Sequence, residues 1–230
     1  CEGPNWAVNI LAELEQMALA QSAHNMMGYR WHGPDDLPNM ATSPDSNVGN
    51  TTPSVFICPS ADKMRQTVSS WALESMAKGN YAANFGADTY LSFDDPLKAG
   101  PFASVMLPGC PGRVTQSGWV DDQLGAWKMG HGQGTTIAEI RDGTSNTLAV
   151  SEVIGYDHPI DGRGAWIAPT VGGSTFTART GPNSRDYDNL AMCYTGIPEA
   201  DIRHCTENHS DGNIWAAARS RHSGGVNAAM

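Results

Sequence analysis

Frequent glycine and proline residues set the strongest constraint on how this chain can fold. Of its 230 residues, 25 are glycine and 14 are proline. Glycine frees the backbone and proline removes a backbone donor, so the sequence predicts short elements joined by many turns. Residues 6–27 differ: they read WAVNILAELEQMALAQSAHNMM, with apolar side chains at helical spacing. We expect a single helix there.

Shorter apolar runs predict the other elements. We expect strands at residues 55–58 and 147–155, an extended segment at 80–93, a second short helix at 67–78 and a helical turn at 135–140. A helix that comes before the strands is typical of an α+β fold. The length fits one domain over residues 1–230, in which the N-terminal helix packs on an antiparallel β-sheet with long loops.

The charge of the chain limits its partners. The formal net charge is -10, from 14 Lys and Arg against 24 Asp and Glu. This charge repels a phosphate backbone and no basic cluster offsets it locally, so we expect no nucleic-acid partner. No stretch approaches the roughly 20 apolar residues that a membrane helix requires.

Five cysteines are spread along the chain: Cys1, Cys58, Cys110, Cys193 and Cys205. They form no CxxC pair, which disfavours thioredoxin-like chemistry and favours disulfides in an oxidising compartment. Cys193 and Cys205 bracket a short polar loop and are the first predicted pair. Cys58 with Cys110 is the second. The alternative is a set of buried free thiols.

The sequence DGTSNT, beginning at Asp142, allows two interpretations. Asp142, Thr144 and Asn146 alternate oxygen-bearing side chains around Gly143, as calcium prefers, and Glu152 from the neighbouring strand could add a carboxylate. In the other interpretation the segment is a turn, in which Asp142 or Asn146 bonds its own backbone and Gly143 supplies a positive φ. The turn is the favoured interpretation because such turns are common.

No other cofactor is expected from local spacing. His204, Cys205 and His209 lie close in sequence, but zinc requires four ligands at familiar spacings and no CxxC or HExxH supplies the others. The serine of DGTSNT also lacks the GxSxG context of a nucleophile. We therefore expect no enzymatic activity, although long loops could still bring distant residues together.

Seven separated pieces of the chain follow one another in a recognisable order. They are WAVNILAELEQ, FICPS, NYAANFG, GPF, TIAEIRDGTSNTLAVSEV, GAW and RSRHSGGVNAAM. The ordered set resembles a large bacterial family of type IV pilin-like proteins. In that family a prepilin-type N-terminus, which is cleaved and methylated, precedes a head domain of unknown function.

The resemblance also assigns motif residues. It places Asp142, Gly143 and Asn146 in an internal motif. It places His222, Gly224 and Gly225 in a closing motif of a His, a Gly-Gly spacer and an Asp-Gly. The N-terminal hydrophobic helix of the family and the closing Asp-Gly are not in this sequence, so we expect a chain that is cut at both ends.

The resemblance implies a structural function. The chain would be the head domain of a subunit in an extracellular pilus-like filament or a type II secretion-type pseudopilus, acting by assembly. Its partners would be copies of itself in a homo-oligomer or helical filament, other pilins or secretion proteins, and the membrane through the missing helix. We expect it outside the bacterial cell or on its surface. The alternative is a secreted binding module for glycans or proteins, which would need a concave aromatic patch.

Overall fold

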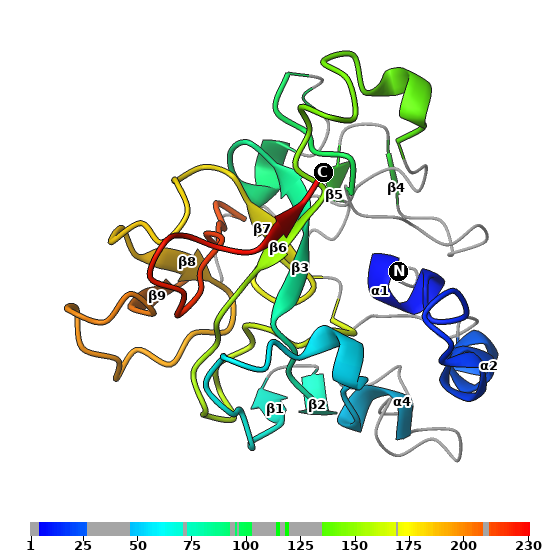
Figure 1. Cartoon of the computed structure of the whole chain (residues 1–230). Helices are drawn as coiled ribbons and strands as arrows, with labels where there is room; N and C mark the ends of the chain where they lie inside the picture. Colours follow the sequence, from blue (N-terminus) through cyan, green and yellow to red (C-terminus); the bar gives the residue numbers. More distant parts are fainter. Residues whose placement is uncertain are drawn as a thin grey trace.

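The computed structural model describes residues 5–26, 47–70, 73–92, 95, 97–102, 114–115, 118–119, 135–168, 170–208 and 212–230. Across these ranges the fold is α+β, as predicted, with short helices and four small β-sheets (Figure 1). Within the same ranges no helix is both long enough and apolar enough to cross a membrane.

The N-terminal segment forms two helices, so the prediction of a single helix over 6–27 is wrong. They are α1 (Trp6–Asn9) and α2 (Met17–Met26). Between them Glu15 has a φ of 60°, in the left-handed region that a continuous helix does not allow. The next backbone N–H, that of Gln16, donates to Leu11 O at 2.9 Å, which closes the turn. The break lets α1 and α2 contact each other and share one core.

The N-terminal helices share this core with a β-hairpin. β1 (Val68–Ser70) pairs antiparallel with β2 (Leu73–Met76). Val68 and Met76 lie opposite each other across the hairpin and are both buried. The prediction of a helix over 67–78 is wrong because this long-range packing overrides the local helical pattern.

A short α-helix and a 3-10 helix precede the hairpin, namely α4 (Asn47–Asn50) and η1 (Ser54–Phe56). The expected strand at 55–58 is therefore wrong. Pro53 is the N-cap residue just before η1, and its carbonyl accepts the Phe56 N–H at 2.9 Å. Phe56 is buried and stacks on Trp166 with ring centroids 5.5 Å apart, so the turn serves to place an aromatic ring in the core.

The central sheet is mixed, whereas an antiparallel sheet was predicted. In spatial order its strands are β10 (Ala228–Ala229), β6 (Val150–Glu152), β3 (Tyr81–Gly86) and β7 (Thr175–Thr177). β6 is antiparallel to both β3 and β10, and β7 is parallel to β3. β3 is buried throughout after Tyr81, which is typical of a strand covered on both faces. In Figure 1 the sheet lies between the N-terminal helices and strands β8 and β9.

Strands β8 (Asp188–Leu190) and β9 (Cys205–Glu207) pair in parallel beside the central sheet. The predicted disulfide between Cys193 and Cys205 is present here, which indicates an oxidising compartment. Cys58 is a buried free thiol. The predicted pairing of Cys58 with Cys110 is therefore wrong, and Cys110 itself lies outside the described residues.

Four further short elements complete the described fold. They are η2 (Tyr90–Ser92), β4 (Val114–Thr115), β5 (Gly118–Trp119) and η3 (Ile137–Glu139). η3 falls on the helical turn expected at 135–140. A capping box explains its stability: the Glu139 carboxylate accepts the backbone N–H of Thr136 at 2.7 Å and its hydroxyl at 2.8 Å.

Lys78 is a buried cation between the hairpin and the central sheet. Its Nζ donates to the carbonyls of Tyr156 and His158, both at 2.8 Å. Burial lowers the pKa of Lys78 from 10.5 to about 8, although the nearby Asp161 and Asp157 favour the charged form. Below this pKa the folded protein therefore holds a desolvated charge.

We expect the free energy of unfolding to increase with pH because the pKa of Lys78 is lower in the folded protein. As the pH rises from about 8 to about 10.5 the folded state releases the Lys78 proton before the unfolded state does. The unfolded state then binds more protons, so the free energy of unfolding increases in this window. In the unsubstituted protein the free energy of unfolding should increase by up to about 3 kcal/mol. The Lys78→Met variant should not show this increase. Urea unfolding of both proteins across the window checks this, and parallel pH profiles would contradict it.

Candidate functional site

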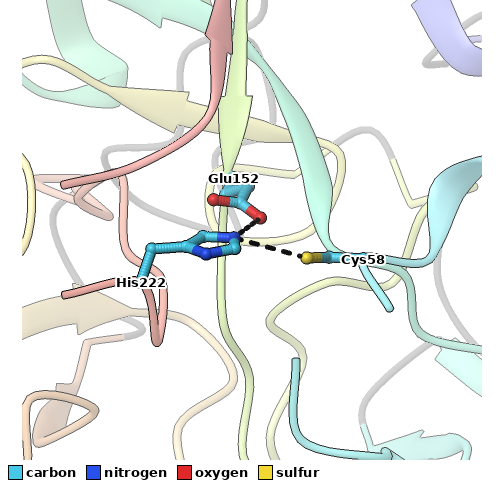
Figure 2. Close-up of side chains that lie close together, drawn as sticks. All are labelled: Cys58, Glu152 and His222. Carbon is cyan, nitrogen blue, oxygen red and sulfur yellow. Dashed lines mark hydrogen bonds and ion pairs between the residues drawn. The ribbon is translucent and has the colours of Figure 1, made fainter. Parts of the chain in front are cut away.

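Three side chains that are far apart in sequence meet beside the central sheet. The Nε2 atom of His222 lies 3.0 Å from Glu152 Oε1 and 3.6 Å from Cys58 Sγ. Figure 2 shows that both contacts end on the same ring nitrogen. One ligand atom from each of the three residues lies within 4.8 Å of the other two. We call these three residues the Cys–Glu–His cluster.

Asn80, just before β3, positions Cys58. The Cys58 backbone N–H donates to Asn80 Oδ1 at 3.1 Å, and the Asn80 N–H donates to Phe56 O at 2.7 Å. The Asn80 carbonyl accepts the N–H of Val153, the residue after β6, at 2.8 Å. The buried side chain and the backbone of Asn80 therefore fix the loop that carries Cys58 relative to β6, the strand that carries Glu152.

Glu152 is the last residue of β6 and pairs with Tyr81 of β3. Its carboxylate is 2 % exposed, and its Oε2 accepts the Asn227 N–H at 2.7 Å. Burial alone would raise the pKa of Glu152. Its interactions with the Cys58 side chain, the Asn227 N–H and His222 outweigh burial, and the net pKa lies below the ordinary value. Glu152 is therefore ionised at neutral pH.

His222 comes from the loop between the buried Arg219 segment and β10. Ser220 Oγ accepts the His222 backbone N–H at 3.0 Å and donates to Gly225 O at 2.6 Å, which fixes the loop. Gly225 has a φ of 143°, whereas a side chain at Gly224 would point into open space. The closing motif of the sequence therefore shapes a rigid loop that presents an imidazole to Glu152.

Polar atoms crowd around the Nε2 of His222. Besides Glu152 Oε1 and Cys58 Sγ, Ser60 Oγ lies 3.3 Å away and Asn227 Nδ2 lies 2.9 Å away. Ser60 Oγ is also 3.1 Å from Cys58 Sγ. A ring nitrogen offers either one proton or one lone pair, so hydrogen bonding alone cannot satisfy all of these neighbours.

The geometry argues against a nucleophilic triad. In a triad the base accepts the nucleophile's proton with one ring nitrogen, and the carboxylate orients the ring through the other. Here thiol and carboxylate approach the same nitrogen (Figure 2). A thiol, a carboxylate and an imidazole that converge on one point are instead the ligand types of a transition-metal site.

Tyr81 reports the electrostatic character of the cluster. Burial raises the pKa of the Tyr81 hydroxyl, and its interactions with Cys58 and Glu152 raise it further. The surroundings of the cluster therefore disfavour an additional negative charge on Tyr81.

The DGTSNT segment forms a hydrogen-bonded turn. Asn146 Nδ2 donates to Asp142 O at 2.7 Å, and Thr147 Oγ1 donates to Asp142 Oδ1 at 2.8 Å. Gly143 has a φ of 86°, as the turn requires. Glu152, proposed from sequence as a calcium ligand with Asp142, Thr144 and Asn146, instead binds His222 and Asn227. Calcium at this turn stays a prediction that no contact among the described residues supports.

Sequence reasoning found the members of the cluster but gave them separate roles. Cys58 was assigned to a disulfide, Glu152 to calcium and His222 to a closing motif. The available signal was that FICPS, TIAEIRDGTSNTLAVSEV and RSRHSGGVNAAM each contain at least one metal-binding side chain. Nothing local indicated that the three pieces meet.

Comparison with known proteins gives one match. No curated protein and no solved structure shows significant similarity to the chain. A family model described as "Protein of unknown function (DUF1559)" matches residues 2–230. Since this match covers nearly all of the sequence, the chain belongs to the DUF1559 family.

Proposed function

We propose that this protein is the head domain of an exported, pilin-like structural subunit that acts by assembly in a filament or pseudopilus. The attachment of the N-terminal segment carries the proposal. Asn5 Nδ2 donates to Trp166 O at 2.7 Å, and Trp6 Nε1 donates to Ser174 O at 2.6 Å. Ala7, Val8 and Leu11 follow and are buried in the core.

This attachment suits a subunit that is held through its N-terminal side. In a pilin-like protein, the helix before the head would pack in the filament, so any load reaches the head through this segment. Here the load would pass from residues 5 and 6 to the buried Trp166 and to the segment before β7. Membership of the DUF1559 family and the disulfide, which suits an oxidising compartment, also support the proposal.

The alternative of a glycan-binding module has less support. Trp166 and Trp215 are buried, and Trp6 is half-buried against Phe56 with ring centroids 5.8 Å apart. Trp215 also packs under the guanidinium of Arg179. In the described part of the chain these tryptophans act as core anchors, and they form no exposed stacking surface.

Electron microscopy of material sheared from cells that produce the full-length gene product tests the proposal. We expect regular filaments or tubes that bind antibodies raised against the head and that disappear when the gene is deleted. Mass spectrometry of the purified filaments should identify this chain as a repeating component. Discrete, non-assembled particles under all conditions would overturn the proposal.

A further inference from the structure

We propose that Cys58, Glu152 and His222 bind a divalent transition metal ion, with Zn²⁺ as the best fit. The three residues would supply three ligands, and the fourth position would remain open to a water molecule or another small ligand. The proposal does not depend on filament assembly. It rests on ligand chemistry, on interatomic distances and on the way in which the surrounding residues hold the three side chains.

The ligand set fits zinc in type. Zinc binds thiolate sulfur, imidazole nitrogen and carboxylate oxygen, whereas calcium and magnesium prefer ligand sets made of oxygen alone. Three protein ligands with a free fourth position are typical of zinc sites that hold a water molecule. Cys58 and Glu152 are 3 % and 2 % exposed, so their negative charges would lie out of water. A divalent cation would neutralise both.

The distances also fit. A tetrahedral zinc ion separates an imidazole nitrogen from a thiolate sulfur by about 3.5 Å, and from a carboxylate oxygen by about 3.3 Å. In the structure the corresponding distances from His222 Nε2 are 3.6 Å to Cys58 Sγ and 3.0 Å to Glu152 Oε1. Cys58 Sγ and the Glu152 carboxylate also lie within 4.8 Å of each other, so small side-chain movements would bring all three atoms to the separations that an ion requires.

The surrounding residues hold the ligands as in a metal site. Glu152 Oε2 accepts the Asn227 N–H, which leaves Oε1 free to face the ion. Asn80 fixes the Cys58 loop and Ser220 fixes the His222 loop. If the lone pair of His222 Nε2 coordinates the ion, Glu152 Oε1 and Cys58 Sγ face the ion and no longer compete for that nitrogen.

The site is also accessible. The His222 side chain is 34 % exposed, which gives an ion a path from solvent to the two buried ligands. Ser60 Oγ borders the cluster, 3.1 Å from Cys58 Sγ and 3.3 Å from His222 Nε2. A bound ion would link three segments, since Cys58 and His222 are 164 residues apart and Glu152 and His222 are 70 apart. It would act as a removable crosslink beside the end of strand β6 in the central sheet.

Metal binding to the purified full chain without an affinity tag tests the proposal. After removal of metal with a chelator, titration with Zn²⁺ in competition with a chromophoric chelator should show one tight site per chain. Co²⁺ should give a thiolate-to-cobalt charge-transfer band and the visible bands of tetrahedral coordination. Zn²⁺ should also slow the reaction of Cys58 with a thiol reagent. These measurements omit reductant, so that the Cys193–Cys205 disulfide stays intact.

Two histidine variants separate the site from general effects. His222→Ala removes a half-exposed ligand and should weaken zinc binding at least about 100-fold. His204→Ala removes a half-buried histidine outside the cluster and should bind like the unsubstituted protein. Circular dichroism and thermal unfolding without metal should show that both variants fold. Absence of a tight site in the unsubstituted protein, or equal affinity in His222→Ala, would overturn the proposal.

Discussion

Replacement of Asp188 by alanine is expected to lower the free energy of unfolding by about 3–5 kcal/mol, because two buried arginines share this carboxylate. Asp188 Oδ2 lies 3.0 Å from Arg163 Nη1, and Asp188 Oδ1 lies 2.9 Å from Arg219 Nη2. The side chains of all three residues are at most 2 % exposed. The variant would therefore leave two guanidinium groups in the core with less compensating charge.

The contacts around this group show how strongly the fold depends on it. Asp188 Oδ1 also accepts the Ala217 N–H at 3.0 Å, which ties β8 to the segment before Arg219. Arg163 pairs in addition with the buried Asp161 at 2.6 Å. Burial alone would lower the pKa of Arg163, but Asp161 and Asp188 outweigh it and raise the pKa above the ordinary value. The arginine thus stays charged in the core.

Asp88→Ala is the matched control. Asp88 also pairs with two cations, Lys98 at 2.9 Å and Arg179 at 2.6 Å, but its side chain is 28 % exposed and those of its partners are 47 % and 40 % exposed. Exposed pairs contribute only about 0–1 kcal/mol. Unfolding in guanidinium chloride should therefore show that Asp188→Ala loses several times more free energy of unfolding than Asp88→Ala. Similar small losses would show that the buried network is not what stabilises the fold.

Removal of the Cys193–Cys205 disulfide has the next largest expected effect. The bridge spans 12 residues, and a loop of about this length restricts the unfolded chain by about 3 kcal/mol. Both cysteines are buried beside the ion-pair network, and Arg163 Nη2 lies 3.5 Å from Cys205 Sγ. We expect the Cys193→Ala, Cys205→Ala double variant to lose about 3 kcal/mol.

Cys58→Ala is the control for this loss, because it also removes a buried cysteine sulfur but breaks no disulfide. Both variants should be unfolded in the presence of a metal chelator, so that an ion at the Cys–Glu–His cluster does not contribute. We expect the single variant to lose less than half as much stability as the double variant. Equal losses would mean that packing, and not the crosslink, accounts for the effect.

Features that depend on neighbours in sequence could be predicted. Cys193 and Cys205 bracket a short loop, and they form the disulfide that this spacing indicated. The turn at Asp142 needs a glycine at positive φ and short polar side chains, and all are adjacent in sequence. The capping box of η3 lies within four residues. Each of these contacts closes a small loop, so local chemistry alone is sufficient to specify it.

The tertiary structure decided the features that depend on distant partners. Residues 67–78 have a helical pattern, yet β1 and β2 form within this range because Val68 and Met76 are buried against segments far away in sequence. The parallel pairing of β7 with β3 joins residues about 90 positions apart, which no turn signal encodes. Helices α1 and α2 are separate because the break at Glu15 lets both pack on that core.

In the candidate site, too, some features follow from the sequence and others depend on the tertiary structure. The sequence by itself determined that Cys58, Glu152 and His222, which all have metal-binding side chains, lie in separate pieces of the family pattern. It could not show that they meet, because a contact across 164 residues depends on how the whole sheet is ordered. Strand β6 carries Glu152 between β3, next to which Asn80 binds the Cys58 backbone, and β10, which follows the His222 loop. That strand order is a result of long-range packing, and it brings the three side chains together at one point.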